Sequence, residues 1–130
     1  MIVDSSAIIA VLRNEPDAAA ISAALQQAPI CRMSAVTYVE AAVVTDSNGN
    51  PVLSRRFDDL LRDVKMRVES VTFDHARIAR QAYRDFGKGR HKAGLNFGDC
   101  FAYALAKDLD EPLLFKGDDF RHTDVDAVKI

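Results

Sequence analysis

The sequence predicts an α/β protein in which helices cover both faces of a mostly parallel sheet. Short apolar, β-branched segments alternate along the chain with longer segments of helical periodicity, which is the pattern of such sheets. The chain has 130 residues, of which 48% are hydrophobic and 28% charged, as expected for one globular domain with one core. We therefore expect a single domain spanning residues 1–130.

In the first third of the chain, apolar runs mark strands and turn residues end the helices. The predicted elements are a strand at 2–3, helices at 5–13 and 17–27, a strand at 30–31, and a helix capped by Ser34 that runs to about Val44. The turn formers from Asp46 to Pro51 then form a loop between two helices.

The remaining two thirds continue the alternation. The predicted elements are an amphipathic helix carrying Leu53 to Val64, a strand at 68–73, a helix capped by Asp74 that reaches Phe86, a glycine-rich basic loop, a helix capped by Asn96 that runs to about Lys107, a strand at 112–115 and an edge strand at 125–130.

Several classes of protein are excluded. The apolar start is too short for a signal peptide, and no run approaches the ~18 apolar residues of a membrane span, so we expect a cytoplasmic protein without membrane contact. Cys31 and Cys100 lie in apolar stretches without metal-ligand spacing, which favours buried, reduced thiols. His75, His91 and His122 are scattered and are expected at the surface.

Four acidic positions stand out because each lies in or beside an apolar segment. They are Asp4 after Met1-Ile2-Val3, Glu40 within Tyr38–Val44, Asp99 before Cys100-Phe101-Ala102, and the pair Asp118-Asp119 after Pro112–Phe115. Each has a simpler explanation. Asp4 and Asp99 are in positions to cap helices, and adjacent aspartates are common in turns. Glu40 is harder to explain among its valine neighbours, and its alternative is partial exposure on a packed helix.

As a set, the four acids are more informative. Two carboxylates ~6 Å apart repel by roughly 3 kcal/mol at an effective dielectric near 20, so four together require a cation. Oxygen ligands suit Mg²⁺ or Mn²⁺, and such ions activate water for the hydrolysis of phosphodiesters. The sequence thus indicates a metal-dependent phosphodiesterase.

The formal net charge of −2 is unusual for a protein that binds nucleic acid, but the basic residues are concentrated. Lys88, Arg90, His91 and Lys92 lie in the glycine-rich loop just before Asp99 and are candidates for phosphate binding. A solvated, flexible connector is the alternative. Ser6 is a candidate to hydrogen-bond a ligand beside Asp4.

The chain resembles the PIN-domain family and, within it, the VapC ribonuclease toxins of bacterial toxin–antitoxin pairs. The resemblance rests on four motifs at family-like spacing: Met1–Ala7, Ser34–Ala41, Asn96–Ala106 and Leu113–Phe120. It implies a three-layer α/β/α sandwich, a Mg²⁺ or Mn²⁺ site, cleavage of RNA, a homodimer, and inhibition by a VapB-like antitoxin.

By motif position, the resemblance implies that Asp4, Glu40 and Asp99 are catalytic metal ligands, with Asp119 rather than Asp118 as the fourth acid. Phe115 departs from the family, which often has Thr or Ser there. Two other functions compete. A haloacid-dehalogenase-like phosphatase needs a second Asp where this chain has Ser6, and a catalytically silent PIN-like module for dimerisation or partner binding normally lacks one or more acids.

Overall fold

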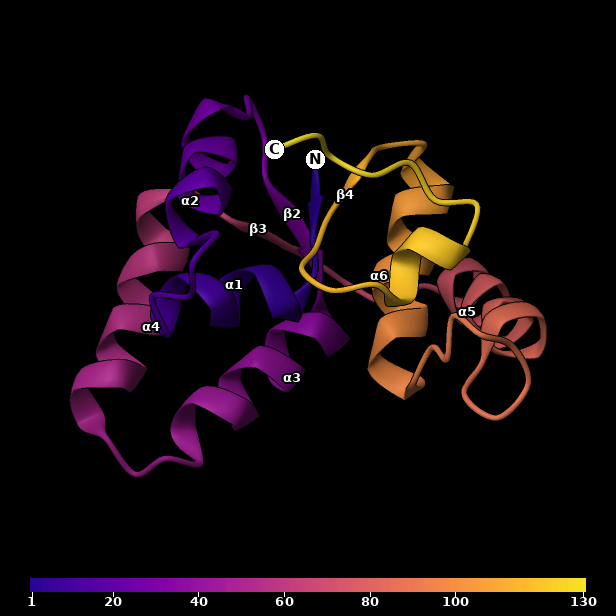
Figure 1. The fold of residues 1–130 in the computed structure, drawn as a ribbon, viewed down its shortest axis with the longest axis horizontal. Coiled ribbons are helices and arrows are strands. Elements are labelled where there is room, and N and C mark those ends of the chain that lie inside the picture. The colour runs from indigo at the N-terminus through magenta and orange to yellow at the C-terminus, as the bar shows by residue number, and fades with distance from the viewer.

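The computed structural model describes residues 1–130 and is a three-layer α/β/α sandwich, as the sequence predicts (Figure 1). Its four strands form one parallel sheet in the order β3-β2-β1-β4. The elements are β1 (Ile2–Val3), α1 (Ser5–Leu12), α2 (Ala18–Gln27), β2 (Arg32–Ser34), α3 (Ala35–Asp46), α4 (Pro51–Asp63), β3 (Arg67–Glu69), α5 (Phe73–Phe86), α6 (Phe97–Leu109), β4 (Leu113–Leu114) and a short 3-10 helix, η1 (Asp119–His122).

Successive residues of the central strands face opposite layers, because side chains alternate along a strand. Ile2 and Leu113 pack with α5 and α6 in one core cluster, whereas Val3 and Leu114 pack with α1 to α4 in another. The two helical layers lie on opposite sides of the sheet in Figure 1. No helix combines the length and hydropathy that crossing a membrane requires.

Three predicted strands need correction. Strand β2 begins at Arg32, two residues later than expected, and it pairs with both β1 and β3. A charged residue is tolerated there because its guanidinium contacts Glu69 at 3.2 Å and Glu111 at 3.0 Å. Strand β3 ends at Glu69, and the expected edge strand at 125–130 is reduced to a single bridge between Ala127 and Leu113.

The helix caps agree with the sequence in two places and differ in one. Ser34 and Asn96 accept hydrogen bonds from the first turns of α3 and α6, as predicted. Helix α5 is capped by Thr72 instead of Asp74, because Thr72 forms a capping box with His75. Because the strands are parallel, their carboxyl ends lie at the same edge of the sheet. Asp4, Ser34 and the segment leading to η1 lie at the carboxyl ends of β1, β2 and β4, and so at that edge.

Candidate active site

Asp4 caps α1 and is also the most deeply buried of the four candidate acids. Its Oδ2 accepts hydrogen bonds from the Ser6 backbone at 3.1 Å and the Ser6 hydroxyl at 2.6 Å. Its Oδ1 is buried without any partner. Burial, with a smaller contribution from the charge of Glu40, raises the pKa of Asp4 to about 6. Capping therefore accounts for one oxygen of this carboxylate and leaves the other unexplained.

Asp99 belongs to a capping box at the start of α6. Its backbone N–H donates to Asn96 Oδ1 at 2.8 Å, and its Oδ2 accepts from the Asn96 backbone at 3.0 Å. Burial raises the pKa of Asp99 to about 7 despite that hydrogen bond, and the charges of Asp4, Glu40 and Asp119 add to the shift. The structure thus brings the other three candidate acids close enough to Asp99 for their charges to act on it.

Glu40 reaches the cluster from α3. Its Oε1 accepts a hydrogen bond from the Ser5 hydroxyl at 2.6 Å, and its carboxyl group lies against Gly98, where a Cβ atom would collide with it. The valines around it do not enclose it, because Val39 is 55% exposed and Val43 is 60% exposed. The residues that position Glu40 are therefore Ser5 and Gly98, neither of which the sequence identified; only the adjacency of Ser5 to Asp4 offered a signal.

The two aspartates before and within η1 have different surroundings. Asp118 is exposed and lies 3.6 Å from the Arg121 guanidinium. Asp119 is exposed as well, but it lies near enough to Asp99 for its charge to raise the pKa of that carboxyl group. The next residue, Phe120, is 3% exposed and packs on Phe115 with ring centroids 5.2 Å apart, which holds the turn against the core. This geometry favours Asp119 as the fourth acid.

Ser6 connects the ends of two strands. Its hydroxyl donates to Asp4 and accepts from the backbone N–H of Lys116, just after β4, at 3.0 Å. The Lys116 side chain in turn contacts Glu15 at 2.8 Å and Asp17 at 3.2 Å. These bonds give Ser6 a positioning role toward Asp4. The second lone pair of its hydroxyl is not used, so a contact with a ligand stays a prediction.

The glycine-rich basic loop is a folded turn. Lys88 N–H donates to Leu95 and Leu95 N–H donates to Phe86, each at 2.9 Å, and Leu95 is fully buried. His91 is half-buried: its Nδ1 accepts from the Ala93 backbone at 3.0 Å, and its ring contacts Phe86 edge-on. The alternative of a flexible connector is not supported. The cations of the loop, Lys88, Arg90 and Lys92, remain exposed.

The sequence also predicted the exposure of the three histidines and the burial of the two cysteines. The expectation that the histidines lie at the surface is wrong for His75, which is buried and contacts Asp108 at 2.8 Å. The expectation of buried, reduced cysteines is confirmed, since Cys31 and Cys100 are both buried and free. Burial raises the pKa of the Cys100 thiol to about 11, so it is not a thiolate nucleophile near neutral pH.

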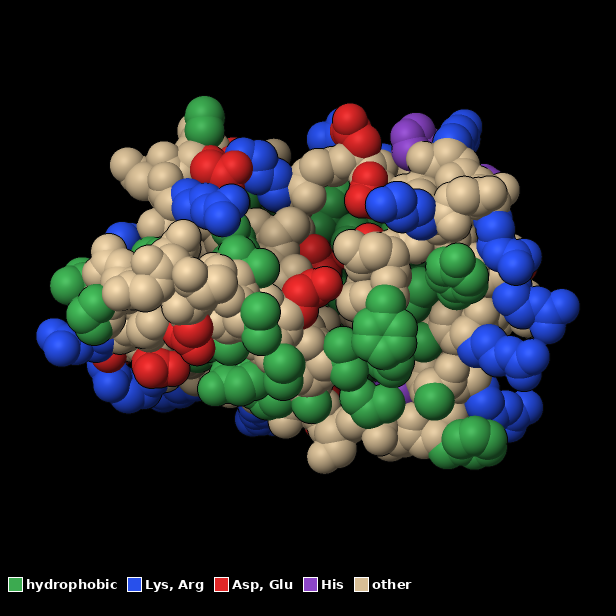
Figure 2. Space-filling view, turned by 90° about the horizontal axis from the view of Figure 1, so that it is seen from below, with side chains coloured by type: hydrophobic (Ala, Val, Ile, Leu, Met, Phe, Trp, Pro, Cys, Tyr) green, Lys and Arg blue, Asp and Glu red, His purple; other side chains and the backbone are tan.

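The donor set fits a hard divalent cation in its chemistry. Figure 2 shows acidic side chains in a hollow at the centre of one face, with hydrophobic side chains beside them. Carboxylate oxygens are the ligands that Mg²⁺ and Mn²⁺ prefer, and the buried Oδ1 of Asp4 lacks any protein partner. However, no group of three or more His, Cys, Asp or Glu side chains stands in an arrangement that holds a metal ion.

The fold and this cluster of acids at one sheet edge define a class of protein. The PIN domain model matches residues 1–126, and the chain belongs to the PIN domain family. Its curated relatives include Ribonuclease VapC28 of Mycobacterium tuberculosis, 57% identical over 126 residues that cover 96% of this chain and 95% of the relative. Ribonuclease VapC of Mycolicibacterium smegmatis is 48% identical and covers 98% of this chain and 99% of its own.

Solved structures share the fold at low sequence identity. The crystal structure of Mycobacterium tuberculosis VapC20, described as a toxin that cleaves the sarcin-ricin loop, matches with a TM-score of 0.75, 17% identity, and coverage of 98% of this chain and 97% of that one. The FitAcB structure from Neisseria gonorrhoeae matches with a TM-score of 0.71, 18% identity, and coverage of 98% and 96%. These likenesses establish the fold.

Proposed function

We propose that this chain is a metal-dependent endoribonuclease and the toxin of a VapBC-type toxin–antitoxin pair. The observation that carries the proposal is the convergence of Asp4, Glu40, Asp99 and Asp119 at one sheet edge, where burial and mutual repulsion raise the pKa values of Asp4 and Asp99. The similarity to curated VapC ribonucleases over nearly the whole chain supports the same activity.

The residues that would hold Mg²⁺ or Mn²⁺ are these four carboxylates. Such an ion, when bound, supplies activation of the attacking water and neutralises charge on the phosphodiester. The protein contributes the arrangement of ligands: Ser6 orients Asp4, Ser5 orients Glu40, and the Asn96 backbone orients Asp99. Because metal ligands must be deprotonated, we expect the affinity for the ion to increase as the pH rises.

The proposal is tested with purified protein, free of antitoxin, and a pool of total RNA. Cleavage is expected to disappear in EDTA and to return when Mn²⁺ is added in excess, and mapping of the new RNA ends identifies the cleaved site. Asp118→Asn, which leaves the four acids intact, is the matched control and should respond to EDTA in the same way. Full activity in chelator would exclude the metal mechanism.

The partners follow from the same assignment. The substrate is RNA, and the inhibitor is a VapB-like antitoxin, which is in keeping with the likeness to a toxin–antitoxin complex from Klebsiella pneumoniae with a TM-score of 0.70, 17% identity, and coverage of 92% of this chain and 88% of that one. A homodimer, which the family resemblance implies, belongs to the same proposal. Light scattering of the purified chain at several concentrations tests it.

The competing function is a catalytically silent PIN-like module that serves only dimerisation or partner binding. The retention of all four acids argues against it, because a module without metal would carry the repulsion among them for no benefit. Dimerisation and antitoxin binding without any cleavage in Mn²⁺ would favour it.

A further inference from the structure

The unpaired positive charge of the protein is concentrated on one segment. Five of the 17 Lys and Arg residues form ion pairs, namely Arg32, Arg62, Lys107, Lys116 and Arg121. Of the remaining twelve, six lie between residues 77 and 92. Residues 73–92 carry six Lys and Arg against two Asp, in a chain whose formal net charge is −2. This segment is therefore the part of the surface that would attract a polyanion.

The positively charged side chains form a row along the exposed face of α5. Arg77, Arg80 and Arg84 recur at helical spacing beside one shallow surface hollow, and Lys88 continues the row just beyond the helix. Figure 2 shows a row of Lys and Arg side chains along one edge of the molecule. Of the acids nearby, Asp108 contacts His75 and Asp85 accepts from Gln81, which leaves Asp74 as the one unpaired carboxylate beside three arginines of the same hollow. We call Arg77, Arg80, Arg84 and Lys88 the α5 ridge.

Aromatic rings with arginines above them flank the ridge. The Arg77 guanidinium lies 5.9 Å from the centroid of Phe73, and that of Arg90 lies 5.6 Å from the centroid of Tyr83. Phe73 is 79% exposed and Tyr83 is 42% exposed. Alternation of cations with exposed aromatic rings is the pattern of surfaces that bind single-stranded nucleic acid, where bases stack on rings and phosphates contact Lys and Arg.

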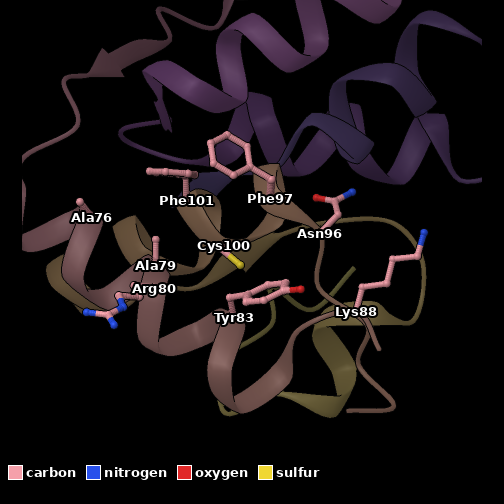
Figure 3. Close-up of a pocket in the computed structure, with 9 residues that line it drawn as sticks. All are labelled: Ala76, Ala79, Arg80, Tyr83, Lys88, Asn96, Phe97, Cys100 and Phe101. Atoms are coloured by element: carbon pink, nitrogen blue, oxygen red, sulfur yellow. The ribbon is translucent and has the colours of Figure 1, made fainter. Parts of the chain in front are cut away.

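A groove connects the ridge to the acid cluster. It has a volume of about 600 Å³ between α5 and α6, and Figure 3 shows Tyr83 lying across it, with Lys88 and Asn96 at one end and Arg80 towards the other. Asn96, which caps α6 and holds Asp99, also lines the adjoining hollow that contains Glu40. A chain lying in the groove would thus pass from the α5 ridge to the carboxylates without crossing the sheet.

We infer that the α5 ridge and this groove bind a single-stranded stretch of the substrate RNA next to the scissile phosphate, with Tyr83 as a stacking platform. The inference rests on the proposed ribonuclease function and adds the surface that holds the RNA. Charge complementarity identifies single-stranded RNA as the ligand. The α5 ridge carries four unpaired cations, and a polyanion with exposed bases matches both the cations and the aromatic rings.

The test compares two triple variants of equal charge change. Arg77→Gln, Arg80→Gln and Arg84→Gln together remove the arginines of the ridge, whereas Arg55→Gln, Arg56→Gln and Lys65→Gln remove three exposed, unpaired cations from the other helical layer. Binding of a short unstructured RNA is measured by fluorescence anisotropy in EDTA, which prevents metal-dependent cleavage, at several salt concentrations. Circular dichroism verifies that both variants are folded.

The ridge variant should bind RNA at least about tenfold more weakly at low salt, and its plot of log affinity against log salt should be shallower by about 2, as expected for three lost phosphate contacts on a single strand. The control variant should stay within about twofold of the unaltered protein, since its cations lie away from the groove. Tyr83→Ala should weaken binding by roughly tenfold without changing the salt dependence, because stacking is not ionic.

Equal affinities for the two triple variants would overturn the inference, as would an absence of RNA binding by the unaltered protein. A ridge variant that loses dimerisation or antitoxin binding while keeping its RNA affinity would show that the ridge is a protein interface. Failure of the proposed function is seen separately, as an absence of cleavage by the unaltered protein in Mn²⁺.

Discussion

Helices α5 and α6 begin with the same local structure and end up in opposite chemical environments. Each opens with a capping box in which the third helical residue accepts a hydrogen bond from the backbone N–H of the cap: His75 from Thr72, and Asp99 from Asn96. Both side chains are nearly buried, at 7% and 8% exposure. His75 then donates from Nε2 to Asp108, whereas Asp99 faces three further acids.

The difference separates a structural residue from a candidate catalytic one. At α5 every polar group of the box has a partner, so burial of the histidine costs little. At α6 the box satisfies one oxygen of Asp99, and the neighbouring charges still oppose its ionisation. A capping motif therefore does not exclude a functional role; the neighbours that tertiary folding supplies decide it.

The largest effect should come from Asp99→Asn, which retains an oxygen for the Asn96 backbone and removes the charge. Turnover on RNA in Mn²⁺ is expected to fall at least about 1000-fold, equivalent to about 4 kcal/mol of barrier, while the fold remains intact. Turnover is measured together with thermal melting in EDTA, where the melting temperature should rise because repulsion is relieved. A variant that melts at a lower temperature yet cleaves RNA normally would show that Asp99, like His75, has a structural role only.

The second prediction concerns pH. The pKa of Asp99 is raised from 3.8 to about 7, so between those values the folded protein keeps a proton that the unfolded chain has lost. The unfolding free energy of the metal-free protein should therefore decrease as the pH rises through this window, with a contribution on the order of 4 kcal/mol. Urea denaturation in EDTA at both ends of the window, for the unaltered protein and Asp99→Asn, isolates this contribution. Parallel pH dependences of the two proteins would contradict it.

His75→Ala should have the reverse profile of Asp99→Asn. It removes the acceptor for Thr72 and the partner of Asp108, so the unfolding free energy is expected to fall by about 2 kcal/mol. Cleavage per folded molecule should be unchanged, because His75 is tied to Asp108 and is not among the groups whose charges act on Asp99. Denaturant melts and turnover corrected for the folded fraction give both quantities. A loss of turnover in fully folded protein would break the contrast between the two helices.

The smallest effect distinguishes the two aspartates near η1. Asp119→Asn removes one of the charges that raise the pKa of Asp99 and that His75 does not experience. Turnover should fall at least about tenfold, equivalent to about 1.4 kcal/mol of barrier. Asp118→Asn, whose carboxylate contacts only Arg121, should stay within a few-fold of the unaltered protein. Both are measured on the same RNA at saturating Mg²⁺. The opposite order would identify Asp118 as the fourth acid.

The sequence by itself determined the layered fold and the position of most elements, because these depend on local patterns. The apolar strand at Ile2-Val3, the caps Ser34 and Asn96, and the acids at 4, 40, 99 and 119 were all visible from periodicity, capping preference or motif spacing. The family resemblance connected those acids into one site, and their proximity in the structure agrees with it.

Only the tertiary structure decided which polar residues meet across long separations in the chain. The charge of Arg32 in β2 is met by Glu69 and Glu111, and buried His75 finds its partner in Asp108, 33 residues away. Likewise, Ser5 and Gly98 acquire their roles only because α3 delivers Glu40 to them. Local propensity carries no information about such partners, since burial and charge are properties of the assembled neighbourhood.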